Sequence, residues 1–304
     1  MSSACLLTAL LGAACPTQTA PLDAAADAIE RLYVDAATAT RIAADLRLAA
    51  REGRYAGLCA DRAGFVEALN RRLDAEDPHF HVESHDDVSG DDWLTQWRAE
   101  ARRTGAGVRE AAVLEGNIGY LRLASFHDWE QAGPQLTAAF TLLGHTDALV
   151  LDLRRNGGGA PDTANRLVRA FVGEAVSQVQ SIRRRSGTRP DPLPRDGLPR
   201  YDRPLAILVD RRTGSAAEFV AYSLQALGRA TIVGAPTGGA AHMVGDPQPL
   251  GGGLLISIPD AAPVNDVTGG NWERRGVAPD LPGGDDPAFV ARRHLMDTLA
   301  AAGR

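Results

Sequence analysis

Two short stretches combine residue types that could support acyl-transfer chemistry. The segment Thr213-Gly214-Ser215-Ala216-Ala217-Glu218 carries a serine, and the segment Asp152–Gly159 ends in three consecutive glycines. A serine at the start of a helix lies among unpaired backbone N–H groups, where the helix dipole favours negative charge. Glycines let further N–H groups approach a ligand without a Cβ clash. One stretch could supply a nucleophile and the other an oxyanion hole. Taken singly, each also fits a purely structural helix cap or tight turn.

The elements around these stretches predict an α/β core. Each stretch follows a short apolar run, at 148–151 and 205–209, and precedes an amphipathic segment typical of a helix. Further strands are expected at 112–114, 118–123, 176–182, 230–233 and 254–258, and further helices at 131–143 and 287–302. Strands that alternate with helices indicate an α/β fold.

The chain before this core has the pattern of a small helical domain. Apolar residues recur at helical spacing in three stripes: Leu22, Ala26, Ile29, Leu32 and Tyr33; Ile42, Leu46 and Ala49; Phe65, Leu69 and Leu73. Pro78 is expected to end the last helix. We therefore predict a helical domain over residues 21–82 and a core over residues 83–304.

Composition excludes some classes of function. The net charge of −6 argues against a nucleic-acid partner, which would favour a basic face, and the 304 residues include no lysine. Cysteines stand only at positions 5, 15 and 59, so neither a zinc knuckle nor a disulfide framework is indicated. If the N-terminal segment is removed, Cys59 is expected to be left as a lone buried thiol.

The first 20 residues resemble an export signal. An apolar run from Ala4 to Ala14 is too short to span a bilayer as a helix but suits the apolar part of a signal peptide. Gly-Ala-Ala-Cys at 12–15 also loosely resembles a lipoprotein cleavage site. Residues 1–20 are therefore expected to be a signal segment. They place the protein in the periplasm or outside the cell, with a lipid anchor as the one expected form of membrane attachment.

Four motifs, in this order, resemble those of the S41 serine peptidases. They are an Asp-x-His after the helical domain (77–79), Leu-Val-Leu-Asp-Leu-Arg-x-Asn-x-Gly-Gly (149–159), Ser-Ala-Ala-Glu (215–218) with its following Gly-rich segment, and Asn-Trp-Glu-x-x-Gly-Val-x-Pro-Asp (271–280). The likeness covers residues 22–280. It implies a ClpP/crotonase-like core and hydrolysis of peptide bonds in a peptide or protein substrate, with no cofactor and no metal.

The departures from the family are informative. Tail-specific members pair the serine with a lysine about 25 positions later, where this chain has Ala240, and the chain has no lysine to replace it. The segment between His79 and Val113 is also too short for the PDZ domain of those members. The tricorn-like branch instead uses a histidine after the helical domain and a glutamate in the last motif.

The resemblance therefore implies Ser215 as nucleophile, His79 as general base and Glu273 as the carboxylate that orients it. Neutral imidazole is a suitable base near pH 7, and a carboxylate fixes its tautomer. His242 is the rival base, because it lies on the loop where the lysine would stand. The oxyanion hole is expected from the backbone N–H groups of three residues: Gly157, Gly158 and Ala216.

Neighbouring polar residues are expected to be structural. Glu218 fits a capping box with Ser215, and Asp152 and Asn156 fit side-chain support of the glycine turn. The histidines and aspartates at 79, 81 and 85–87 lack the spacing of a metal site.

Two other classes of function remain open at this point. A catalytically inactive relative could bind apolar ligands or peptides on the same fold. A crotonase-type acyl-CoA enzyme is disfavoured, because its chemistry does not require this serine together with the last motif.

Overall fold

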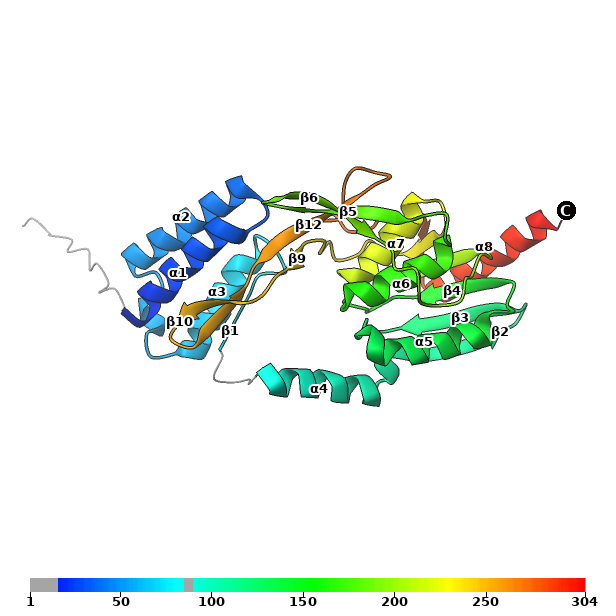
Figure 1. Ribbon diagram of the computed structural model, residues 1–304, viewed down its shortest axis with the longest axis horizontal. Coiled ribbons are helices and arrows are strands. Elements are labelled where there is room, and N and C mark those ends of the chain that lie inside the picture. The colour runs from blue at the N-terminus through cyan, green and yellow to red at the C-terminus, as the bar shows by residue number, and fades with distance from the viewer. Residues whose placement is uncertain (1–15, 85–89, 304) are drawn as a thin grey trace, which may run out of the picture. The chain divides into compact units, whose positions relative to one another are not determined.

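The computed structural model describes residues 16–84 and 90–303, which divide into two compact units (Figure 1). The first unit contains the described residues up to 84, together with Arg184–Ser186 and Met243–Ala261. The second contains Gly90–Arg183, Gly187–His242 and the described residues from Ala262 onward. The sequence had suggested a single boundary at 82. The segment 243–261 instead joins the first unit, because its strands pair with a strand that follows the N-terminal helices.

Three helices build the first unit, as predicted. They are α1 (Pro16–Leu32), α2 (Ala36–Glu52) and α3 (Arg62–Asp74), with a short 3₁₀ turn η1 (Ala56–Leu58) between the last two. All three predicted stripes are buried except for Leu32, which is half-buried. Gly53 ends α2 in the left-handed conformation (φ 61°), which a residue without Cβ adopts without strain.

A small antiparallel sheet completes this unit. Its strands are β1 (His81–Ser84), β11 (Leu254–Ser257) and β10 (Gln248–Gly251), in the order β1-β11-β10. The two-residue strand β9 (Met243–Val244) pairs with the start of β12 (Pro259–Asn265). The carbonyl of Pro259 accepts the N–H of Val34, which ties β12 to the end of α1.

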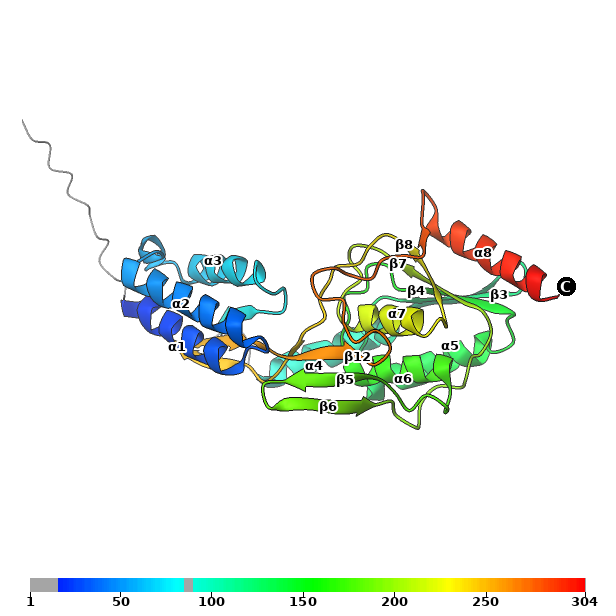
Figure 2. The same ribbon diagram turned by 90° about the horizontal axis from the view of Figure 1, so that it is seen from above.

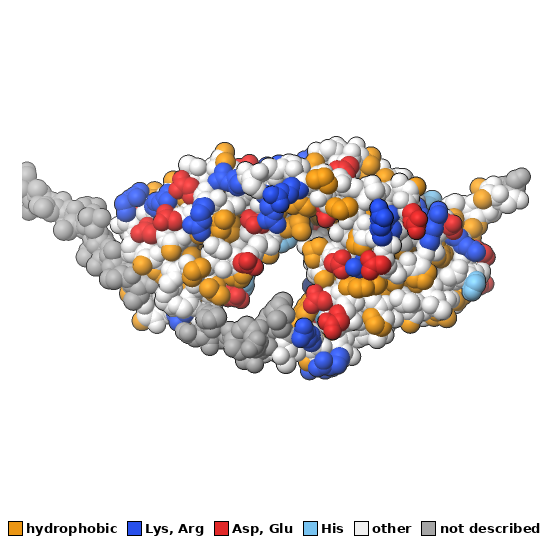
Figure 3. All heavy atoms as spheres, in the orientation of Figure 1, with side chains coloured by type: hydrophobic (Ala, Val, Ile, Leu, Met, Phe, Trp, Pro, Cys, Tyr) orange, Lys and Arg blue, Asp and Glu red, His pale blue; other side chains and the backbone are white. Residues whose placement is uncertain are grey.

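The outer surface of α1 and α2 carries charges of both signs, which lie side by side in Figure 3. Arg47 contacts Asp27 at 2.6 Å and Glu30 at 2.7 Å. Exposed pairs of this kind contribute about 0–1 kcal/mol each to stability. These ion pairs therefore contribute little to the stability of the fold.

A six-stranded sheet forms the centre of the second unit, in the order β13-β8-β7-β4-β3-β2. The strands are β2 (Val108–Leu114), β3 (Ile118–Leu123), β4 (Ala148–Asp152), β7 (Leu205–Val209), β8 (Thr231–Gly234) and β13 (Leu281–Pro282). Only the β2–β3 hairpin is antiparallel, and all other neighbours run parallel. Because parallel strands are buried on both faces, β4 and β7 are wholly apolar until Asp152.

Helices cover both faces of this sheet, as Figure 2 shows. Leu149 and Leu151 belong to one apolar cluster with α5 (Trp129–Leu143), α6 (Pro161–Val172) and α7 (Ala216–Ala226). Ala148 and Val150 face the other way, where α8 (Pro287–Ala302) packs. The sequence therefore predicted the α/β class correctly.

Several elements of the second unit escaped the sequence analysis. The helix α4 (Gly90–Arg103) stands in a stretch for which the sequence analysis predicted no helix. The strand β6 (Gly187–Pro192), which was not predicted, pairs with β5 (Gln178–Arg184), which lies close to the strand predicted at 176–182. Both stretches are mostly polar, so they lack the apolar periodicity that predicts a helix or a strand.

Most of the predicted signal segment, residues 1–15, lies outside the described residues, and residues 16–20 form the first turns of α1. The expected burial of Cys59 was wrong, because the residue is exposed. In the full chain Cys59 is disulfide-bonded, with its partner outside the described residues, so its expected state after removal of the N-terminal segment stays a prediction. None of the described helices has the length and apolar character needed to cross a membrane.

Candidate active site

The two chemistry-bearing turns lie next to each other because they follow neighbouring parallel strands. Asp152 at the end of β4 pairs with Leu208 near the end of β7. The carboxyl ends of parallel strands meet at one edge of a sheet, where ligands of α/β folds are usually bound. The glycine turn leaves β4 and the serine turn leaves β7, so both emerge at this edge.

Asn156 holds the glycine turn in place, as predicted. Its side chain is buried and donates to the carbonyl of Leu123 at 2.9 Å, while its Oδ1 accepts the N–H of Gly158 at 2.9 Å. Its backbone carbonyl accepts the N–H of Gly214 at 2.9 Å. One buried residue thus connects the glycine turn both to β3 and to the serine turn.

Asp152 supports the start of the same turn, which confirms its predicted structural role. Its carboxylate accepts the backbone N–H of Arg154 at 3.0 Å and the hydroxyl of Tyr120 at 2.6 Å. Burial and the adjacent carboxylate raise the pKa of Tyr120 to about 12. Tyr120 therefore remains a neutral donor to Asp152 near pH 7.

Ser215 has a strained backbone at the N-cap position, directly before the helix α7. Its φ of 50° and ψ of −121° lie in a region that residues with a Cβ rarely occupy. Such a conformation costs on the order of 1–3 kcal/mol and persists only where the surroundings enforce it. A strained serine on a strand-to-helix turn is the geometry of a nucleophile elbow, which exposes the hydroxyl.

Gly158 and Ser215 approach so closely that no side chain fits between them. A Cβ added to Gly158 would lie 2.7 Å from the Cβ of Ser215 and 2.9 Å from the nitrogen of Ala216. Gly158 also has a φ of 106°, which disfavours any other residue. The close approach explains the glycine without any appeal to catalysis.

The three expected oxyanion donors differ in availability. The N–H of Gly158 is already used by Asn156. Among the described residues, no acceptor is bonded to the N–H of Gly157 or of Ala216. Two N–H groups on facing turns are therefore open, while Gly158 allows the turns to meet.

Glu218 organises the serine turn more extensively than a capping box requires. It is fully buried, and its Oε2 accepts the N–H of Ser215 at 2.9 Å and that of Ala240 at 2.9 Å. Its Oε1 accepts the hydroxyl of Thr237 at 2.5 Å and the N–H of Gly239 at 2.7 Å. Burial raises the pKa of this carboxyl, although the four donors oppose the shift.

This shared carboxylate brings a distant loop beside the nucleophile. The nitrogens of Ser215 and Ala240 each lie 2.9 Å from the same oxygen, so they are no farther apart than twice that distance. His242 follows two residues later. The sequence analysis found the capping residue but not this second function, because its partners lie about 20 positions away.

Glu273 meets His242 inside the second unit. The Oε2 of Glu273 accepts the N–H of Ala241 at 2.8 Å and that of His242 at 3.2 Å, and it lies 3.9 Å from the Nδ1 of His242. The neighbouring Trp272 donates its indole N–H to the carbonyl of Ala240 at 3.0 Å. The Asn-Trp-Glu motif therefore braces the loop that carries His242.

His79 lies in the first unit, next to a different carboxylate. Its backbone N–H donates to Asp77 at 2.9 Å, and its Nδ1 lies 3.4 Å from the same oxygen. Asp77 is fully buried and also accepts the hydroxyl of Tyr33 at 3.2 Å. The Asp-x-His motif thus supplies a histidine with its own carboxylate. Of the histidines and aspartates considered for metal binding, those at 85–87 lie outside the described residues.

Comparisons with known proteins agree with this geometry. Residues 117–282 match peptidase family S41, a segment that contains the glycine turn, Ser215 and Glu273. A carboxyl-terminal-processing protease of Synechocystis sp. is 34% identical over 125 residues, which cover 40% of this chain and 28% of the relative. A carboxy-terminal-processing protease of Bartonella bacilliformis is 38% identical over 132 residues, or 40% of this chain and 29% of the relative.

The matched segment therefore spans less than a third of the length of these two relatives. Among solved structures, a putative peptidase from Parabacteroides merdae has the same fold, with a TM-score of 0.64, 18% identity, and coverage of 91% of this chain and 96% of that one. The family match extends over more than half of the chain and includes both turns and the Asn-Trp-Glu motif. The chain belongs to peptidase family S41.

Proposed function

We propose that this protein is a serine-type peptidase with Ser215 as its nucleophile. The observation that carries the proposal is the strained backbone of Ser215, held at a helix N-terminus against a glycine turn with open N–H groups. Family membership supports the same reaction. The curated relatives are named for processing carboxyl-terminal ends, so we propose a peptide or protein substrate that is cut near its C-terminus.

In the proposed reaction, the Ser215 hydroxyl attacks the carbonyl carbon of the peptide bond and transfers its proton to a neutral histidine. The N–H groups of Gly157 and Ala216 stabilise the negative oxygen of the tetrahedral intermediate. The histidinium then protonates the leaving amine, which departs and leaves an acyl-enzyme. Water, deprotonated by the same histidine, attacks the ester and releases the new carboxylate.

Two histidines compete for the role of base. The resemblance assigns it to His79, and Asp77 beside it would hold the ring in one tautomer. His242 is the candidate within the core unit, where it lies against Glu273 on a loop joined to the nucleophile through Glu218. With His79 as base, Glu273 would stabilise the loop; with His242 as base, it would orient the ring.

Separate replacement of His79 and His242 by glutamine tests which histidine is the base, and Ser215→Ala tests the function itself. Ser215→Ala should abolish cleavage of a peptide library while lowering the thermal unfolding temperature only slightly, because the loss of its capping contact with the backbone N–H of Glu218 costs about 0.5–2 kcal/mol. The base variant should lose about 10²–10⁴-fold in kcat/KM. The other histidine variant should lose much less. A Ser215→Ala protein with full activity contradicts the proposal.

We propose that the protein is exported to the periplasm or the cell exterior. The apolar run from Ala4 to Ala14, which suits the apolar part of a signal peptide, supports this location. Fractionation of a producing cell, followed by N-terminal sequencing of the mature protein, tests it. A full-length protein found only in the cytoplasm contradicts the proposal.

A further inference from the structure

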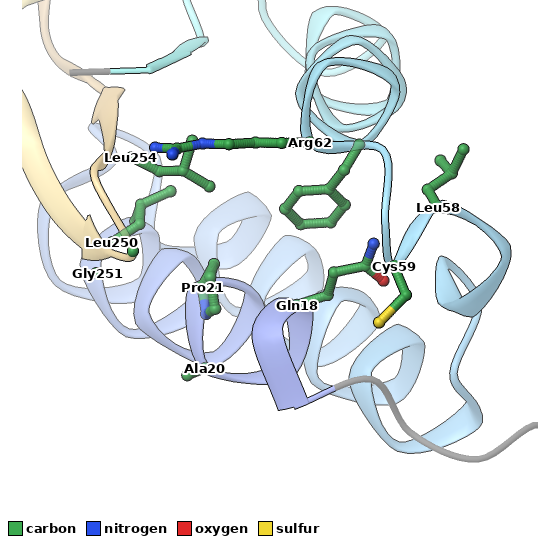
Figure 4. A pocket seen from close by; sticks show the side chains of 11 residues that line it. Gln18, Ala20, Pro21, Leu58, Cys59, Arg62, Leu250, Gly251 and Leu254 are labelled. Carbon is green, nitrogen blue, oxygen red and sulfur yellow. The ribbon is translucent and has the colours of Figure 1, made fainter. Parts of the chain in front are cut away.

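Two features of the surface have no part in the proposed reaction. One is a pocket of about 400 Å³ in the first unit, between α1, the start of α3 and the β10–β11 turn (Figure 4). Its wall is mainly apolar and does not by itself favour one class of ligand. The other is the strand β2 at the edge of the six-stranded sheet, and the composition of this strand favours one particular partner.

The strand β2 has one neighbouring strand and one free edge. It stands last in the sheet order, next to β3, and Figure 1 shows it at the outer margin of the sheet. In an antiparallel pair, a strand turns the backbone groups of alternate residues toward its neighbour and those of the other residues away from it. Among the described residues, the outward groups of β2 have no hydrogen-bond partner. The seven residues of β2 are enough to pair with a further strand.

Most of β2 lacks the features that usually protect a free edge. Lysine, proline, inward-pointing charges and bulges prevent the pairing of exposed edges. The residues 111–114 contain neither a charge nor a proline. The one irregularity of the β2–β3 ladder lies between Val108 and Glu110, at the start of the strand. The second half of the edge is therefore open to pairing.

Exposed apolar side chains flank this edge on both faces of the sheet. Ala111 packs against the apolar cluster that contains α5, and Val113, two residues later, faces the same side and is 50% exposed. Leu142 is exposed on α5, which packs against β2. On the other face the exposed Met296 of α8 lies beside Gly116 in the β2–β3 turn. A partner strand would remove part of this apolar surface from water.

The charges of β2 are complementary to those of a second copy of the same strand. In an antiparallel pair of two copies centred on Ala112, Ala111 of each copy lies opposite Val113 of the other. Arg109 of each copy then lies at the level of Glu115 of the other, so both ends of the pair bring opposite charges together. Arg109 and Glu115 are exposed, and neither side chain has a hydrogen-bond or ion-pair partner in the described part of the chain.

We propose that two copies of this chain associate through antiparallel pairing of their β2 strands, centred on Ala112. The pairing joins the two six-stranded sheets into one continuous sheet. A two-fold axis through Ala112 makes every contact occur twice, as in most homodimers. The association does not depend on the proposed peptidase activity.

Sedimentation velocity over a concentration series tests the association with the full chain. We expect a reversible dimer with twice the chain mass of 32.1 kDa. Val113→Lys places a charge on the apolar flank and should raise the dissociation constant of the dimer by at least about tenfold. Val244→Lys is the matched control, because Val244 is 46% exposed but lies on β9 in the first unit. A protein that is monomeric at every concentration overturns the proposal.

Charge reversal tests the register of the pair. Arg109→Glu or Glu115→Arg alone brings like charges together at both ends, so either variant should weaken the dimer about tenfold. The double variant Arg109→Glu/Glu115→Arg restores opposite charges and should associate as tightly as the unsubstituted protein. Both positions are exposed, so the circular dichroism spectrum should not change. A double variant that is as weak as the single variants overturns the pairing centred on Ala112.

Hydrogen exchange locates the interface without any substitution. The amide protons of residues 108–114 should exchange more slowly as the protein concentration rises, because pairing protects the outward N–H groups. The strand β6, at the edge of another sheet, is the control and should exchange at a rate independent of concentration. A dimer in which exchange slows elsewhere but not at 108–114 associates through a different surface, and this result overturns the proposal.

Discussion

Substitution of the two adjacent glycines at the active-site turn should have opposite consequences for stability. Gly158→Ala places a Cβ 2.7 Å from the Cβ of Ser215 at a φ of 106°. The left-handed backbone costs about 1–3 kcal/mol for a residue with a Cβ, and overpacking adds about 1–3 kcal/mol. The free energy of unfolding should therefore fall by about 2–6 kcal/mol.

Gly157→Ala is the matched control for this effect. No atom lies within 4 Å of the added Cβ, and Gly157 is not among the residues with positive φ. Its substitution should change the unfolding free energy by less than about 1 kcal/mol and can stabilise, because alanine has fewer unfolded conformations than glycine.

Tryptophan fluorescence during urea unfolding is a suitable assay. All four tryptophans of the chain, at positions 93, 97, 129 and 272, belong to the second unit, so the signal reports the unit that contains both glycines. Similar unfolding free energies for the two variants would refute the close approach of the glycine turn to Ser215.

Three other predictions follow from buried or paired groups. In Glu218→Gln an amide NH₂ replaces one carboxylate oxygen and faces N–H or O–H groups that can only donate. The unfolding free energy should therefore fall by about 3–6 kcal/mol, and hydrolysis should be lost. A variant that is stable in urea and normally active contradicts this. Asn156→Ala removes two buried hydrogen bonds, and it should cost about 2–4 kcal/mol by the same urea assay; a change below about 0.5 kcal/mol would show that the glycine turn does not depend on it. A hydrogen bond from Arg41 and another from Arg72 lower the pKa of Glu76 to about 2. The stability that the lowered pKa provides is present above the unfolded pKa near 4.5 and is lost as the pH falls toward 2. Unfolding followed by circular dichroism should show that the unfolding free energy of Glu76→Gln falls by about 1–2 kcal/mol less over this pH range than that of the unsubstituted protein. Identical pH profiles contradict the assignment.

The sequence predicted those parts of the fold that local pattern determines. The helix 287–302 and the β2–β3 hairpin follow from periodicity and from turn residues at 115–117. The positions of the glycine turn and the serine turn were predicted for the same reason, since an apolar strand, small residues and an amphipathic helix follow one another in each. Asn156 and Asp152 could be assigned because one partner of each, Gly158 and Arg154, lies only two residues away.

Features that depend on distant partners were missed. The segment 243–261 joins the first unit through pairing of β11 with β1, about 170 positions earlier in the chain, and no local signal indicates it. The second role of Glu218 and the contact of Glu273 with His242 arise in the same way. The helix α4 was missed because its residues are mostly polar, so its apolar face is narrow.

The central claim is that Ser215 is an activated nucleophile, and covalent labelling tests it most directly. The folded protein is treated with a fluorophosphonate probe, and the modified peptide is identified by mass spectrometry. We predict a single adduct on Ser215 that disappears in the variant of the base, either His79→Ala or His242→Ala, and persists in the other. Absence of an adduct on Ser215 in protein that is folded by circular dichroism would contradict the claim and would favour a binding module on the same fold.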